Sequence, residues 1–123
     1  MSRKRTILVV DDNIMLMKTL KSILDRKGYQ VFTAVSGVEA LQQLDAHEID
    51  ILLTDLRMPV MNGLELYRAC KKRKPDVIAY LMSAFTSDDL VGVGLREGIR
   101  SVLTKPFDID EMLALFSEAF ECV

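Results

Sequence analysis

Several polar side chains that can do chemistry stand directly after short apolar runs in this sequence. They are Asp11, Asp12, Asp55, Ser83 and Lys105. Continuous apolar runs of this kind are typical of buried parallel strands, and ligands of an open α/β sheet bind beyond the carboxyl ends of its strands. If the runs belong to one sheet, three carboxylates, a hydroxyl and an ammonium lie at one edge. Such an edge is an oxygen-rich cation site with its own counter-charge, and it points to metal-assisted phosphate chemistry.

The three carboxylates suit Mg²⁺, which prefers oxygen ligands in near-octahedral geometry and keeps several waters. Without a cation, the carboxylates would repel one another, and at least one would tend to hold a proton. Taken alone, Asp11-Asp12-Asn13 could equally be a turn and a helix cap. The third carboxylate, Asp55, ends a second apolar run, and this placement favours the metal site.

An aspartate at such an edge can also be a nucleophile that forms an acyl phosphate. The metal would neutralise the incoming phosphoryl group, Lys105 would hold one of its oxygens, and Ser83 would donate a hydrogen bond to another. Taken singly, Lys105 would be a surface residue and Ser83 a turn residue. Their positions at strand ends are the reason for including them in the site.

Strand-like and helix-like patterns alternate along the whole chain and would position these residues. Apolar runs predict strands at Ile7–Val10, Tyr29–Ala34, Ile49–Thr54, Val77–Met82 and Ser101–Thr104. Apolar residues at helical spacing follow each strand, and the expected helices begin near Ile14, Ser36, Asn62, Asp88 and Asp108.

Local signals mark the boundaries of these helices. Ser36 is followed three residues later by a glutamate, as are Asn62 and Asp108, which is the spacing of helix caps. Gly28 and Gly98 are expected to end the helices before them, because glycine adopts the left-handed backbone conformation readily.

Five β-α units with short connections predict one α/β domain with a parallel sheet, right-handed crossovers and helices on both faces. Five strands permit the flavodoxin-like order 2-1-3-4-5, whose switch point lies between the first and third strands. Those are the strands that end at Asp11-Asp12 and at Asp55, so the predicted fold and the predicted site agree.

The composition fits a single domain over residues 1–123. Half of the residues are hydrophobic, so a core can form without disulfides. The net charge of −2 gives no reason to expect a nucleic-acid or membrane partner, and no apolar segment is long enough for a signal peptide or a membrane span. Cys70 and Cys122 stand in no metal or redox spacing and fit a reducing, cytoplasmic environment.

The sequence resembles the receiver domain of two-component response regulators over essentially its whole length. The motifs, in the family's order and spacing, are Asp11-Asp12, Asp55-Leu56-Arg57-Met58-Pro59 with Asn62-Gly63, Ser83-Ala84, and Lys105-Pro106-Phe107. Chemotaxis regulators of this family have the strand order 2-1-3-4-5 that was already expected. The expected strand order is therefore not evidence independent of the resemblance.

The resemblance implies a signalling switch rather than an enzyme with turnover. Such a domain takes phosphate from a histidine on a sensor kinase or phosphotransfer protein, and it then changes conformation to control an output domain or target protein. Any catalysis is directed at its own aspartate. The chain ends with the last predicted helix, so no DNA-binding output is expected within it.

The resemblance also assigns roles at the acidic edge. Asp55 would be the phospho-acceptor, and Asp12, Asp55 and the backbone carbonyl of Arg57 would bind Mg²⁺. Asp11 would support the metal by orienting a metal-bound water.

Further roles fall on the other two strand ends. Ser83 matches the family's switch hydroxyl, and Lys105 matches its phosphate-binding lysine. The bond between Lys105 and Pro106 is expected to be cis, which proline allows at small cost. His47, the single histidine, is expected to face solvent away from the site and not to donate phosphate.

Two features depart from the family pattern. Val102 stands three residues before the lysine, where the family often has an aromatic ring that swings inward, and valine has no ring and few rotamers. Phosphorylation is therefore expected to act mainly through residues 84–89 and the helix Asp88–Glu97.

The second departure is the pair of glycines inside that helix. Gly92 and Gly94 each lower its helix propensity by about 1 kcal/mol relative to alanine. We therefore expect it to be the least stable helix of the domain, unless the glycines serve close packing.

Two other function classes fit less well. A haloacid-dehalogenase-type phosphatase also uses a strand-end aspartate and Mg²⁺, but it needs a second aspartate where this chain has Arg57. A nucleotide-binding module needs a glycine-rich turn after the first strand, and Asp11-Asp12-Asn13 would repel phosphates in the absence of metal.

Overall fold

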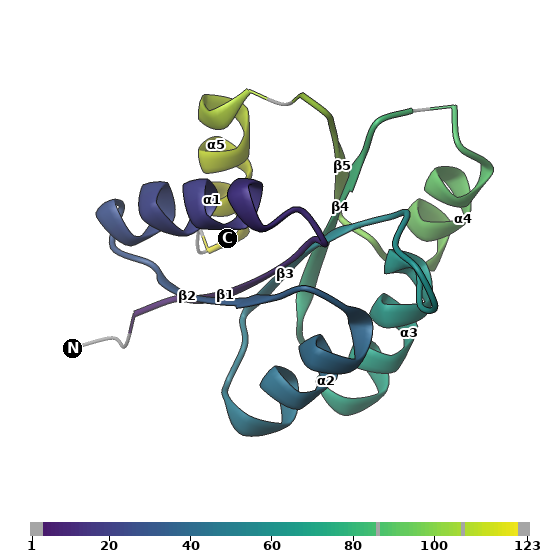
Figure 1. The fold of residues 1–123 in the computed structure, drawn as a ribbon, viewed down its shortest axis with the longest axis horizontal. Coiled ribbons are helices and arrows are strands. Elements are labelled where there is room, and N and C mark those ends of the chain that lie inside the picture. Colours follow the sequence, from purple (N-terminus) through teal and green to yellow (C-terminus); the bar gives the residue numbers. More distant parts are fainter. Residues whose placement is uncertain (1–3, 86, 107, 121–123) are drawn as a thin grey trace.

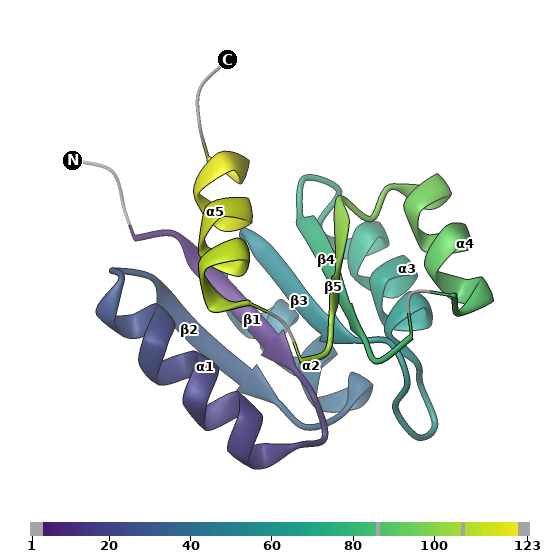
Figure 2. The same ribbon diagram turned by 90° about the horizontal axis from the view of Figure 1, so that it is seen from above.

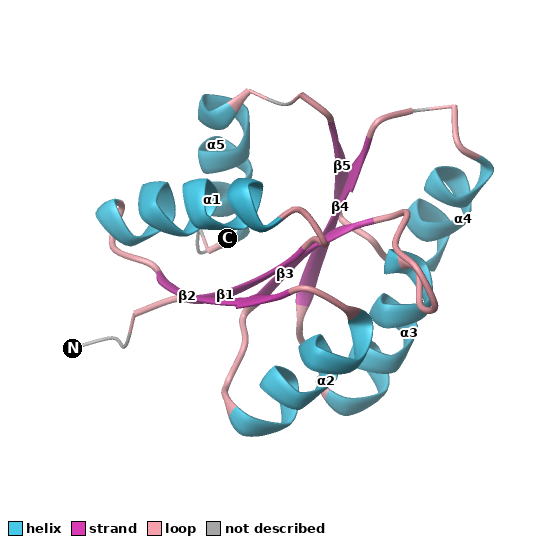
Figure 3. Ribbon diagram, in the orientation of Figure 1, coloured by secondary structure: helices cyan, strands magenta, loops and turns pink. Residues whose placement is uncertain are grey.

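The computed structural model describes residues 4–85, 87–106 and 108–120. Strands and helices alternate along these residues (Figures 1 and 3). The elements are β1 (Thr6–Val10), α1 (Ile14–Arg26), β2 (Gln30–Ala34), α2 (Gly37–Ala46), β3 (Ile51–Asp55), α3 (Gly63–Arg73), β4 (Ile78–Ser83), α4 (Asp89–Glu97), β5 (Ser101–Thr104) and α5 (Ile109–Ala119). Among the helices of these residues, none is both long and apolar enough to span a membrane.

The strands form one parallel sheet in the order β2-β1-β3-β4-β5, which confirms the predicted topology. The register brings the carboxyl ends of neighbouring strands to a common level: Val10 lies beside Ala34 on β2 and beside Thr54 on β3. The residues that follow these strand ends therefore meet at one edge of the sheet.

The central strands β1, β3 and β4 are mostly apolar because helices cover both faces of the sheet. Helices α1 and α5 lie on one face, and α2, α3 and α4 lie on the other (Figures 1 and 2). Alternate residues of β1 serve the two cores: Ile7 and Val9 pack with the α1 and α5 side chains, and Leu8 and Val10 pack with the opposite set. The exclusion of solvent from both faces explains why these central strands show no polar alternation, whereas the edge strand β2 includes the exposed Gln30.

The helix caps and helix-ending glycines predicted from the sequence are present in the structure. The side chain of Asn62 accepts a hydrogen bond from the Glu65 amide while the Glu65 carboxylate accepts one from the Asn62 amide, which is a complete capping box. Gly28 and Gly98 have backbone φ angles of 94° and 119°, as expected for residues that end helices. An alanine at Gly98 would also place its Cβ 2.5 Å from the Tyr67 hydroxyl oxygen.

The boundaries of four of the five strands differ from the prediction by one or two residues. The third strand begins at Ile51 rather than Ile49, because the Asp50 side chain accepts the Thr6 amide (2.9 Å) before the regular pairing with β1 starts. The third and fourth strands also run one residue further than expected, to Asp55 and Ser83, because these residues still pair with the neighbouring strand. Both site residues are thus held by the sheet itself.

Candidate functional site

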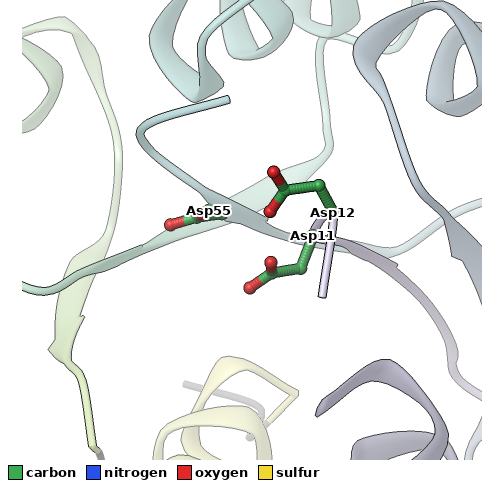
Figure 4. Close-up of side chains that lie close together, drawn as sticks. All are labelled: Asp11, Asp12 and Asp55. Carbon is green, nitrogen blue, oxygen red and sulfur yellow. The ribbon is translucent and has the colours of Figure 1, made fainter. Parts of the chain in front are cut away.

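Asp11, Asp12 and Asp55 converge at the carboxyl edge of the sheet (Figure 4). One carboxylate oxygen from each of them lies within 4.8 Å of the other two. Asp11 and Asp55 are buried and Asp12 is exposed. The sequence prediction that strand ends would bring these residues together is met, and the cluster is open to solvent on the side of Asp12.

Contacts of the main chain place the backbone of Asp11 and of Asp55. The Asp11 amide donates to the carbonyl of Ala34 (3.2 Å), so β1 remains paired with β2 as far as the site. Behind Asp55, a Cβ on Gly63 would collide with the Asp55 carbonyl oxygen. Gly63 belongs to the sequence motif, but the sequence alone does not explain why a glycine is needed there. The structure explains it, because the N-terminus of α3 approaches the end of β3 too closely for a Cβ atom.

Lys105 reaches into the acidic cluster from the end of β5. Its ammonium nitrogen lies 2.6 Å from Oδ2 of Asp11 and 3.3 Å from Oδ1 of Asp55. Its own backbone amide donates to the carbonyl of Ser83 (2.7 Å), and the bond to Pro106 is cis, as predicted. Phe107, the last residue of this motif, lies outside the described residues.

The electrostatics of the cluster are those of crowded carboxylates with one cation. Burial raises the pKa of Asp55, the negative charge of Asp11 raises it further, and Lys105 acts in the opposite direction. Burial disfavours the charged form of Lys105, yet its hydrogen bond to Asp11 and the charge of Asp55 leave its pKa raised. The site therefore has more negative charge than its lysine compensates.

Asp11 has protein partners on both of its carboxylate oxygens. Oδ1 accepts the backbone amide of Asn13 (2.9 Å), and Oδ2 accepts the Lys105 ammonium. Asp12 and Asp55 are therefore the carboxylates with more capacity for an added cation, which agrees with the supporting role expected of Asp11.

Ser83 is buried and bonded within its own loop. Its hydroxyl donates to the Phe85 carbonyl (2.8 Å) and accepts the Phe85 amide (3.1 Å). The sequence placed this hydroxyl at the sheet edge, and it is there, but its hydrogen bonds are made to the β4–α4 loop and not to the carboxylates.

The side chain of Arg57 makes a contact that sequence reasoning missed. Its Nε and its terminal nitrogen each lie 2.7 Å from a carboxylate oxygen of Asp88, the N-cap residue of α4. The sequence singled out Arg57 for its backbone carbonyl, and singled out Asp88 as a helix start. Nothing in the spacing of 31 residues between them indicates the pair.

The remaining residues discussed from the sequence lie away from the cluster. His47 is exposed at the end of α2 and stacks on Phe32 with a centroid distance of 3.9 Å, so the expectation that it faces solvent is confirmed. Val102 is partly buried beside Leu81 of β4. Cys70 is buried, and burial raises the pKa of its thiol to about 11, whereas Cys122 lies outside the described residues.

A parallel 2-1-3-4-5 sheet with acidic residues at its switch point defines a flavodoxin-like α/β domain with a candidate cation and phosphate site. Residues 7–117 match the sequence profile of the response regulator receiver domain, and the chain belongs to that family. It is thus a receiver domain of two-component signalling, a family whose members act as phospho-accepting switches.

Individual relatives agree with this assignment. The transcriptional regulatory protein GlrR of Escherichia coli is 35% identical over 115 residues, which are 94% of this chain and 26% of GlrR. The chain thus spans about a quarter of that regulator's length.

Solved structures agree as well. The chemotaxis response regulator CheY4 of Vibrio cholerae superposes with a TM-score of 0.87 at 28% identity, covering 96% of this chain and 100% of that one. The regulator TrrA of Thermotoga maritima, in complex with Mg²⁺ and BeF, superposes with a TM-score of 0.81 at 30% identity, covering 94% and 99%.

Proposed function

We propose that Asp55 accepts a phosphoryl group from a phosphohistidine of a sensor kinase or phosphotransfer protein, in a reaction that needs Mg²⁺. The observation that carries this proposal is the convergence of three carboxylates within 4.8 Å, with the Lys105 ammonium among them. Self-directed transfer and hydrolysis at Asp55 are the only catalysis this proposal includes.

The donor set fits a hard divalent cation. Asp12, Asp55 and the backbone carbonyl of Arg57 would hold it, and Asp11 would support it through a bound water. The raised pKa of Asp55 supports this assignment, because a cation would relieve the crowding of negative charge. When bound, Mg²⁺ neutralises charge on the phosphoryl oxygens. The Mg²⁺ complex of TrrA is a further reason to expect this metal.

The chain's own residues carry the transfer step. A carboxylate oxygen of Asp55 forms the new O–P bond as the P–N bond to the donor imidazole breaks, and the electron pair of that bond stays on the imidazole nitrogen. Lys105 turns from the aspartates to an oxygen of the bound phosphoryl group. The Ser83 hydroxyl leaves the Phe85 carbonyl and donates to another oxygen. This exchange of hydrogen-bond partners is the proposed conformational signal.

The surface around the site suits docking of a phosphodonor protein. Large apolar side chains are exposed on the loops and helix starts at this edge, namely Ile14, Met15, Val35, Val38, Val60 and Phe85. Exposed apolar groups gathered in one region mark interaction surfaces. A donor that covers them would bring its histidine to Asp55 and exclude water from the transfer.

The wider setting of the domain follows from its family. We propose a cytoplasmic location, a receiver unit over residues 1–123, and control of an output domain or a separate target protein. GlrR is a transcriptional regulator of which the matched region is a minor part, which makes an attached output one form that this control can take. No direct nucleic-acid or membrane contact is proposed for this chain.

Labelling with acetyl phosphate tests the proposed site. In Mg²⁺, the wild-type protein should gain one phosphoryl group by intact-mass spectrometry, and Asp55→Asn should gain none. Asp76→Asn is the matched control, since Asp76 is exposed just before β4, at the opposite edge of the sheet, and it should label like the wild type. Equal labelling of wild type and Asp55→Asn, or labelling that persists in excess chelator, would refute the proposal.

A further inference from the structure

Two bidentate ion pairs attach α4 to the neighbouring β3–α3 region, one near each end of the helix. At the N-terminal end, the Arg57 guanidinium donates to both carboxylate oxygens of Asp88 at 2.7 Å. At the C-terminal end, Arg68 donates to both carboxylate oxygens of Glu97. The pairs have the same chemistry, but the first lies beside the proposed phosphorylation site.

The N-terminal pair is continuous with the hydrogen bonds of Ser83. The Phe85 carbonyl accepts the Ser83 hydroxyl (2.8 Å) and also the backbone amide of Asp88 (3.2 Å). One carbonyl oxygen therefore joins the proposed switch hydroxyl to the residue that binds Arg57. The Phe85 side chain itself is 71% exposed.

Asp88 has several partners at this position. Its backbone amide donates to the Phe85 carbonyl, and its carboxylate accepts from the Arg57 guanidinium. The carboxylate also accepts the Leu90 amide (3.0 Å) and so caps α4. Its side chain is 10% exposed, whereas that of Arg57 is 63% exposed. Arg57 thus covers the carboxylate at the start of α4, and its hydrogen bonds, followed by that of the Leu90 amide, lower the pKa of Asp88.

We infer that the Arg57–Asp88 pair is a latch that holds α4 in its resting position and opposes the conformational response to phosphorylation. This inference rests on the proposed function of Asp55. When the Ser83 hydroxyl turns to a phosphoryl oxygen, the Phe85 amide and carbonyl each lose a partner. The start of α4 is then held to the β3–α3 loop by the latch, and the strength of the latch sets how far the helix responds.

The position of Arg57 also connects the latch to the metal. Its backbone carbonyl is a proposed metal ligand, and its side chain holds α4, so one residue is shared by both. Cation binding and latch opening should therefore affect each other to the same degree, as linkage requires.

Asp88→Asn tests the latch in the unphosphorylated protein. Asparagine retains an oxygen to cap the Leu90 amide, but it removes the charge that binds Arg57. Hydrogen exchange of residues 89–91 should become about threefold faster or more, and the pattern should shift toward that of the phosphorylated wild type. Glu97→Gln is the matched control, because it removes the equivalent pair at the other end of α4 and should leave residues 89–91 unchanged.

Arg57→Gln and the double variant complete the test. If the pair is a latch, Arg57→Gln accelerates exchange in the same residues, and the double variant adds little to either single change. Additive effects, or exchange in Asp88→Asn equal to the wild type or to Glu97→Gln, would overturn the inference. Absence of labelling at Asp55 in the wild type would instead overturn the proposed function, and the exchange comparison distinguishes the two.

Discussion

At the scale of single residues, the charge that the proposed function needs on Asp55 lowers the stability of the fold. Asp55 is buried beside Asp11, and burial together with that neighbouring charge raises its pKa. A carboxyl group whose pKa is higher in the folded protein than in the unfolded chain destabilises the fold when it is ionised. The residue proposed to accept phosphate is therefore a residue that the metal-free fold would tolerate better without its charge.

Asp55→Asn should accordingly raise the free energy of unfolding of the metal-free domain at pH 7. The gain should shrink as the pH falls through the folded-state pKa of Asp55, and it should vanish below the unfolded value of about 3.9, where both forms are neutral. Urea unfolding in chelator from pH 7 to pH 4 measures this. Asp76→Asn is the control, and a gain from Asp55→Asn that is constant with pH would contradict the argument.

Residue positions in the site were predictable where the backbone decides them. Asp11, Asp12, Asp55 and Lys105 meet because parallel strands place their carboxyl ends at one edge. The hydrogen bonds of the Ser83 hydroxyl were not predictable, because they depend on a rotamer that the loop selects. The partner of Arg57 was not predictable either, because a long side chain chooses among carboxylates that meet only in the folded chain.

At the scale of elements, the two glycines of helix α4 have different surroundings and different roles. A Cβ on Gly94 would lie 3.2 Å from Cγ1 of Ile99 and 3.3 Å from Cδ1 of Leu81, so this glycine permits the close approach of α4 to β4. A Cβ on Gly92 would meet a terminal nitrogen of Arg96 at 3.4 Å, which is the end of a flexible side chain. The alternative of close packing, left open by the sequence, therefore applies to Gly94.

Alanine substitutions should reveal this difference. Gly92→Ala should stabilise the domain by about 0.5–1 kcal/mol through helix propensity. Gly94→Ala should lose that gain, and be neutral or destabilising, because Ile99 and Leu81 must shift. Urea unfolding of the two variants under the same conditions measures both effects. Equal stabilisation by the two substitutions would show that α4 is not packed closely at Gly94.

The elements themselves were predictable because each carries its own signals. Continuous apolar runs identified the strands, and the cap at Asn62 and the left-handed residue at Gly98 identified helix ends. Strand ends shifted by up to two residues, because pairing with neighbours decides where a ladder starts, as Asp50 shows with Thr6. The predicted low stability of α4 remains a prediction, and the ion pairs at both of its ends now count against it.

At the scale of the whole molecule, cation binding should be visible as stability. A ligand that binds the folded state alone adds about 2.7 kcal/mol at a concentration 100 times its dissociation constant. For a domain of this size, each additional kcal/mol of unfolding free energy raises Tm by roughly 3–5 °C. Thermal unfolding with increasing Mg²⁺ should show this rise in the wild type.

Asp12→Ala should lose most of the Mg²⁺-dependent rise, and its Tm in chelator should be higher than that of the wild type, because one of three like charges is gone. Asp76→Asn should behave like the wild type in both conditions. An undiminished rise in Asp12→Ala would mean that the cation binds elsewhere on the domain.

The contact between Arg5 and Phe120 has a consequence for proteins joined to this domain. The Arg5 guanidinium carbon lies 4.6 Å from the centroid of the Phe120 ring, so the two ends of the described chain meet. They meet at the edge where β1 begins, whereas the acidic cluster lies where β1 ends. At about 3.3 Å per residue, the length of β1 separates these edges by roughly 15–20 Å. Chain that continues beyond Arg5 or Phe120 therefore leaves the described residues at the far edge, and we expect a fusion partner or an immobilising tag joined there to leave the approach of a phosphodonor to Asp55 open.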